Sequence, residues 1–95
     1  MQKTLPFEIN EQENIGFIKV SNAFFERDCV LTVIGKYTDE YWATIHPVNP
    51  QEIEISLSLK DGSQIEEDTL KTVLNDFIEY QLKLDMVKEF VSSSN

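Results

Sequence analysis

The side chains that could do chemistry in this chain are few: one cysteine, one histidine and 17 acidic residues. Catalysis by Cys29 and His46 would need the thiol and the imidazole within hydrogen-bond reach, with a carboxylate to orient the ring. Cys29, however, is followed by Val30 and Leu31 in a segment with helical periodicity, which favours a buried structural thiol. We therefore expect no catalytic residue and no enzyme.

Metal and cofactor sites have no better support. Glu66, Glu67 and Asp68 are consecutive at a predicted helix start, so their carboxylates spread around the helix end, where the helix dipole favours negative charge. One cysteine and one histidine cannot build a closed four-ligand zinc site. The three glycines are isolated from one another, so no glycine-rich phosphate loop is present. The sequence predicts neither a metal nor a cofactor.

Aromatic side chains offer a binding function instead. Tyr41 and Trp42 open a predicted strand, and Tyr37 precedes them at the end of a predicted helix. Strand aromatics are usually core residues or cross-strand partners. An exposed aromatic on an edge strand can also anchor an extended peptide that adds to the sheet. Trp42 is therefore our first candidate for contact with a partner.

The charge balance restricts that partner. Eight lysines and arginines face 17 acidic residues, which gives a formal net charge of -9 and a pI near 4.4. This charge opposes binding to nucleic acid and to anionic membranes, and favours a basic peptide segment or a basic enzyme face. The chain has no apolar run of signal-peptide or membrane-span length, and its lone cysteine suits a reducing compartment. We expect a cytoplasmic protein.

These residues must be positioned by one domain over residues 1–95, because a chain of this length builds a single core. Strand composition predicts strands over residues 5–9 and 15–20. A third strand is expected over 41–46, where Pro47 should end it because proline has no N–H for the ladder. An amphipathic pattern predicts a helix over 26–37.

The most regular segment is 52–59, in which apolar and polar residues alternate strictly. Ile53, Ile55, Leu57 and Leu59 point to one face, which indicates an antiparallel sheet covered on a single side. The predicted fold is therefore α+β: a meander-like antiparallel sheet of about four strands with two helices on one face, in the order β-β-α-β-β-α.

The last element is a long helix over 66–91 with two apolar rows. Twenty-six helical residues span about 39 Å, more than the diameter of a domain this small, so part of the helix must overhang, bend or meet another protein. We expect Leu84, Val87 and Phe90 to contact a partner, and the tail over 92–95 to be disordered.

Two motifs around these elements resemble those of a known family. The letters YTDEYW stand at residues 37–42 after the first helix, and LNDFIEYQL stands at 74–82 within the second. With the alternating strand between them, the order resembles the His-Xaa-Ser system protein HxsD and its relatives over about residues 20–90. The resemblance implies a small accessory protein without catalysis of its own, encoded beside radical SAM enzymes that modify ribosomally made peptides.

Two classes of function lead from these observations. The first is an accessory protein that binds the precursor peptide or docks on the radical SAM maturase, which raises the effective concentration of substrate at the enzyme. The second is a structural or regulatory protein that forms homodimers through its C-terminal helix. An acidic mimic of nucleic acid and an enzyme are the less favoured alternatives.

Overall fold

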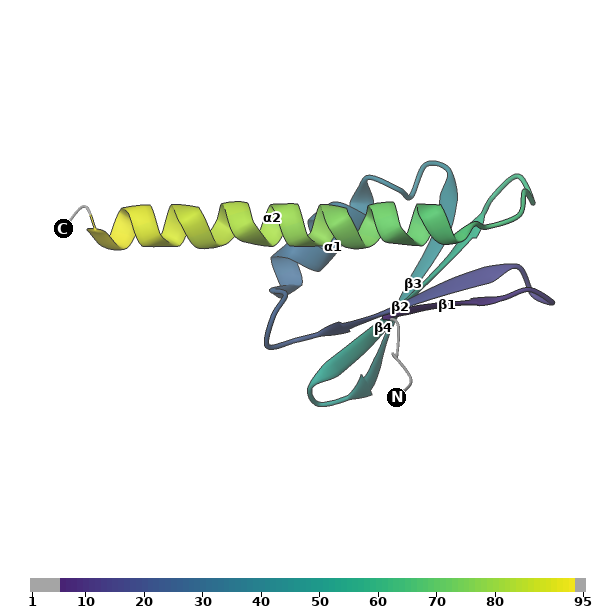
Figure 1. The fold of residues 1–95 in the computed structure, drawn as a ribbon, viewed down its shortest axis with the longest axis horizontal. Coiled ribbons are helices and arrows are strands. Elements are labelled where there is room, and N and C mark those ends of the chain that lie inside the picture. Colours follow the sequence, from purple (N-terminus) through teal and green to yellow (C-terminus); the bar gives the residue numbers. More distant parts are fainter. Residues whose placement is uncertain (1–5, 94–95) are drawn as a thin grey trace.

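The α+β class and the element order β-β-α-β-β-α are confirmed by the computed structural model, which describes residues 6–93 and the side chains of 6–90. The elements are β1 (Phe7–Asn10), β2 (Ile15–Ser21), α1 (Arg27–Gly35), β3 (Tyr41–Asn49), β4 (Glu52–Leu59) and α2 (Glu67–Ser93). Both helices lie on the same face of the sheet (Figure 1). The helix of α2 reaches Ser93, and residues 94–95 of the expected tail lie outside the described range.

The four strands pair antiparallel in the order β1-β2-β4-β3, which corrects the expected meander. Two hairpins are joined through α1, and β4 pairs with β2 in the middle of the sheet. In this position the buried Ile55 stands opposite Ile18 on one side and Ile45 on the other. The most regularly apolar strand thus occupies the centre, and the more polar β3 forms an edge.

Strand β3 extends to Asn49, three residues beyond the predicted end at His46. Pro47 pairs with Ile53, and the register becomes irregular between Pro47 and Asn49. An edge strand tolerates proline where the missing N–H would face away from the sheet. Only one side of β3 is paired, so this proline does not end the strand.

Helix α1 ends at Gly35, two residues before the predicted end at Tyr37. The N–H groups of Lys36 and Tyr37 bond to carbonyls three residues back, at 3.1 and 2.9 Å, which tightens the last turn. The core lies between the sheet and the two helices. Its buried apolar residues are Ile18, Val20, Cys29, Val30, Val33, Ile34, Ile55, Leu57, Ile65, Leu70, Val73 and Phe77.

Helix α2 is longer than the sheet that it covers. Its 27 residues correspond to about 40 Å, and the molecule measures 54 Å along its longest axis. The C-terminal part of α2 projects past the sheet (Figure 1). The overhang expected from helix length is therefore present.

Close packing of α2 on β2 makes a testable point of Gly16. A Cβ atom there would lie 2.7 Å from Cδ2 of the fully buried Leu70 and 3.3 Å from Cγ1 of Ile65. We expect Gly16→Val to lower the free energy of unfolding by about 1–3 kcal/mol through overpacking. The matched variant Gly35→Val meets open space and should be neutral, since valine favours helix more than glycine. Equal urea midpoints for the two variants would contradict this packing.

Candidate functional site

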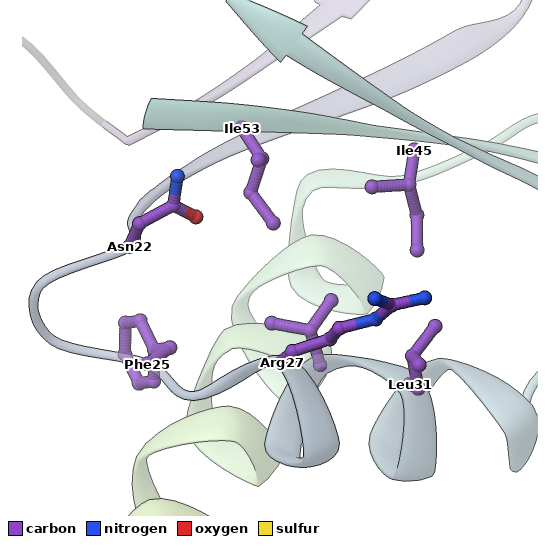
Figure 2. Close-up of a pocket in the computed structure, with 7 residues that line it drawn as sticks. Asn22, Phe25, Arg27, Leu31, Ile45 and Ile53 are labelled. Atoms are coloured by element: carbon purple, nitrogen blue, oxygen red, sulfur yellow. The ribbon is translucent and has the colours of Figure 1, made fainter. Parts of the chain in front are cut away.

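An apolar groove lies between α1 and the strands β3 and β4. Its volume is about 530 Å³, within the range of sites that bind small molecules or side chains. Five of its seven lining residues are apolar, and the other two are an amide and a guanidinium. The lining residues are Asn22, Phe25, Arg27, Val30, Leu31, Ile45 and Ile53 (Figure 2).

The groove exists because helix α1 does not pack fully against the part of the sheet that it faces. Ile45 and Ile53 lie on the helix-facing side of the sheet, in register with the buried Ile55 and Val20. From the opposite side of the groove, Leu31 points from α1 toward Ile45 (Figure 2). Helix α1 packs mainly against α2, so Leu31 and Ile45 both stay partly open to solvent. A further apolar group could therefore enter between them.

One side of the groove is bordered by the free edge of the sheet. Strand β3 pairs only with β4 among the strands that the structure describes. The N–H of Lys60 donates to the carbonyl of Glu40 at 2.9 Å. This bond determines which alternate residues of β3 direct their backbone groups toward β4. Because bonded and non-bonded pairs alternate in an antiparallel ladder, the backbone groups of Ala43 and Ile45 face away from β4. These groups are available to another strand.

Trp42 lies on this edge strand, on the face of the sheet away from the helices. It pairs with Ser58, and 63% of it is exposed. The ammonium of Lys60 lies 4.6 Å from the centroid of its ring. The condition under which Trp42 could anchor a peptide, exposure on an edge strand, is met. Contact with a partner stays a prediction.

The groove wall formed by Phe25 is held in place by Gln81, a buried polar residue of α2. The side-chain oxygen of Gln81 accepts the Glu26 N–H at 2.9 Å, and its amide nitrogen donates to the Glu26 carboxylate at 2.9 Å and to Asp85 at 3.0 Å. Lys88 also hydrogen-bonds Glu26. These bonds fasten the segment before α1 to α2, and they occupy the Glu26 carboxylate.

The bond from Lys88 lowers the pKa of the Glu26 carboxyl below its ordinary 4.5, and the bond from Gln81 adds to this. Because the folded pKa is depressed, this stabilisation is complete above pH 4.5 and is lost as the pH falls through the lowered value. We expect Lys88→Met to return the pKa toward 4.5 in an NMR titration of the Glu26 carboxyl carbon. Lys71→Met, which removes the exposed pair with Glu67, should leave the Glu26 titration unchanged.

The structure does not bring Cys29 and His46 together. Cys29 is fully buried beneath α1, its Sγ 3.4 Å from the carbonyl oxygen of Phe77, and burial raises the pKa of its thiol. His46 pairs with Glu54 on the opposite, open face of the sheet, and its Nε2 lies 3.0 Å from Oγ1 of Thr44. The raised pKa keeps the thiol protonated at neutral pH, and the His46 imidazole is not beside it. Within residues 6–93, no three metal-ligating side chains gather into a cluster.

The remaining predicted contact residues lie on α2. Leu84 is half-buried and packs against the core, and part of its side chain stays accessible. Val87 and Phe90 are exposed on the projecting part of the helix. Nothing in the structure tests whether they contact a partner. Leu82 and Met86 of the same helix are exposed as well.

Sequence reasoning missed the groove residues Arg27, Leu31 and Ile45. One signal was present: Leu31 lies outside the two apolar rows of α1 that contain Cys29 and Val30. An apolar residue off the buried face of a short helix indicates a second contact. The distance between α1 and the sheet edge, which creates the groove, depends on tertiary packing.

The two motifs that carry the family resemblance meet in the structure. The hydroxyl of Tyr37, from the first motif, donates to the Asp76 carboxylate of the second. Burial, together with this bond, raises the pKa of Tyr37 well above its ordinary value of 10.0. Both motifs therefore serve the contact between α1 and α2.

No protein-family model, curated protein or solved structure matches this chain. The resemblance to the HxsD family consequently stays a prediction that rests on the two motifs. In the part of the chain described here, no helix combines the length and the hydropathy needed to cross a bilayer.

Proposed function

We propose that this protein is a non-catalytic accessory module that binds a peptide in extended form at the edge of strand β3. The observation that carries the proposal is a nine-residue strand with one free edge, directly beside an apolar groove. Natural sheets usually protect such an edge, because it is a template for pairing with another chain. An edge left open next to a groove is typical of domains that bind peptides by strand addition.

Strand addition would use both faces of this edge. An added strand lies about 4.8 Å from β3, and its side chains alternate between the two faces of the sheet. Side chains on the helix-facing side would lie beside Ile45 and enter the groove below Leu31. Side chains on the other side would lie beside Trp42. Pro47 lacks an N–H, so pairing is confined to the first half of β3.

The resemblance to HxsD proteins and the net charge indicate which peptide this would be. An accessory protein of a peptide-maturation system would hold the precursor peptide and present it to the radical SAM maturase. A net charge of -9 favours a precursor segment rich in lysine and arginine. Such attraction weakens as salt screens it.

Selection from a random-peptide phage library on the immobilised full chain, followed by calorimetric titration of the enriched peptides, tests the proposal. We expect extended peptides to be enriched, and Ala43→Pro to weaken their binding at least about tenfold because it removes an edge N–H. Ala43→Pro should fold, since its N–H faces away from β4. Met86→Ser changes an exposed residue of α2 that belongs neither to β3 nor to the groove lining, and it should bind as the wild type does.

N-methylation of the enriched peptide provides the matched control on the ligand side. Only alternate amides of an added strand face the β3 edge, so methylation should abolish binding at every second position and spare the positions between. If methylation at both sets has the same effect, or if no peptide is enriched, the proposal is wrong.

The projecting part of α2 favours a second candidate, self-association through this helix. Leu82, Met86 and Val87 on this helix are 56%, 68% and 61% exposed. Apolar side chains gathered in this way are uncommon on monomers. Under this candidate, sedimentation equilibrium should show a dimer that Met86→Ser and Val87→Ser together convert to a folded monomer. A wild-type monomer at 100-fold different concentrations would exclude it and leave the surface to a maturase.

A further inference from the structure

We infer that the groove selects a peptide that carries an apolar side chain next to a carboxylate, and that Arg27 binds the carboxylate. This inference rests on the proposed function and names the ligand chemistry of the same site. It assigns to Arg27 the choice of sequence, while the β3 edge supplies the backbone pairing that any sequence can make.

The position of Arg27 is the first observation. It is the single arginine of the chain and the only charged residue among those that line the groove. Its side chain crosses the groove, with the guanidinium between Ile45 and Leu31 (Figure 2). The guanidinium of Arg27 therefore lies beside apolar walls.

The absence of a partner for this cation is the second observation. Among the side chains of residues 6–90, Arg27 takes part in no salt bridge and no side-chain hydrogen bond. The neighbouring carboxylate of Glu26 is bound to Lys88 and Gln81. In a chain with 17 acidic residues, an arginine in a groove without a carboxylate is available to a carboxylate from outside.

Charge and shape then determine the ligand. A guanidinium binds a carboxylate through two parallel hydrogen bonds, a geometry that a lysine cannot offer. The space below Leu31, lined by Val30, Ile53 and Phe25, accepts an apolar side chain. The overall negative charge repels free anions, so affinity must come from both groups together. We expect a peptide that is basic elsewhere and has one acidic residue or a C-terminal carboxylate at the groove.

N-acetyl-leucine and N-acetyl-leucinamide test this on the labelled full chain by NMR. They share the apolar side chain and differ in the carboxylate. We expect N-acetyl-leucine to shift the methyl signals of Leu31, Ile45 and Ile53 and to bind at least about tenfold more tightly than the amide. Similar affinity for the two compounds, or shifts confined to other methyl groups, would overturn the inference.

Two variants complete the test. Arg27→Gln should remove the preference for N-acetyl-leucine over the amide. Because Arg27 is exposed, the variant should fold, and its backbone amide spectrum should resemble that of the wild type. Lys36→Gln removes an exposed cation just beyond the other end of α1 and should keep the preference. A preference that survives Arg27→Gln refutes the role of Arg27. The N-methylation experiment depends on the edge alone, so failure of strand addition and failure of carboxylate selection are told apart.

Discussion

Ile55→Asp is expected to leave the protein largely unfolded at room temperature. Ile55 has no exposed surface and stands opposite Ile18 and Ile45 in the central strand pairs. An aspartate there would be a buried charge without a partner, which costs several kcal/mol. Proteins of this size are stable by roughly 5–15 kcal/mol, so one such change removes much of the total. Circular dichroism during thermal unfolding measures the effect.

Ser56→Asp is the matched control, one residue along the same strand. Ser56 lies on the open face of the sheet, where its hydroxyl is hydrogen-bonded to that of Thr44, and it keeps part of its surface in water. The aspartate there would remain hydrated, so we expect a loss of no more than about 1 kcal/mol. Since a shift of one residue exchanges the two faces of a strand, similar melting temperatures for the variants would mean that the register is wrong.

The features that the sequence predicted well are those with strong local periodicity. Strand β4 was placed to the residue, because its alternation leaves a single way to bury Ile55 and Leu57. The same alternation indicated one covered face, and both helices lie there (Figure 1). Helix α2 was also predicted closely, and its excess length over a small domain indicated the projecting end.

The features that were missed depend on which elements become neighbours. The order of the strands follows from the apolar character of β4 on one face and from the tolerance of an edge for Pro47, which local patterns do not compare. Helix α1 was predicted two residues too long because Tyr37 continues its apolar row. Tyr37 instead leaves the helix and donates its hydroxyl to Asp76 of α2.

The candidate site divides in the same way. Cys29 was correctly placed in the core because its helical spacing defines a buried face, and Trp42 was identified as a residue whose role depends on an edge strand. The groove was not predicted, because it is formed by the distance between α1 and β3. Arg27 is a candidate because its charge has no partner in the groove, and this depends on which elements surround it.

Phe77→Ala is expected to have the second-largest effect on stability. Phe77 is the largest fully buried side chain of the domain, and its ring centroid lies 5.9 Å from that of Phe25. Truncation to alanine removes apolar contacts and leaves a cavity, at a cost of about 3–5 kcal/mol. Urea unfolding followed by tryptophan fluorescence measures the loss. Phe77→Leu should lose less stability than Phe77→Ala. Because Phe25 lines the groove, Phe77→Leu should still weaken the binding of N-acetyl-leucine.

The neighbouring Ile78→Ala tests whether the orientation of α2 is right. Ile78 lies one residue further along the helix and is 42% exposed, so its side chain points away from the core that contains Phe77. Its truncation should cost well under half of the loss from Phe77→Ala, because fewer of its contacts are with the interior. If Ile78→Ala were as destabilising as Phe77→Ala, α2 would be rotated about its axis. The contact between Phe77 and Phe25, which supports one wall of the groove, would then be wrong as well.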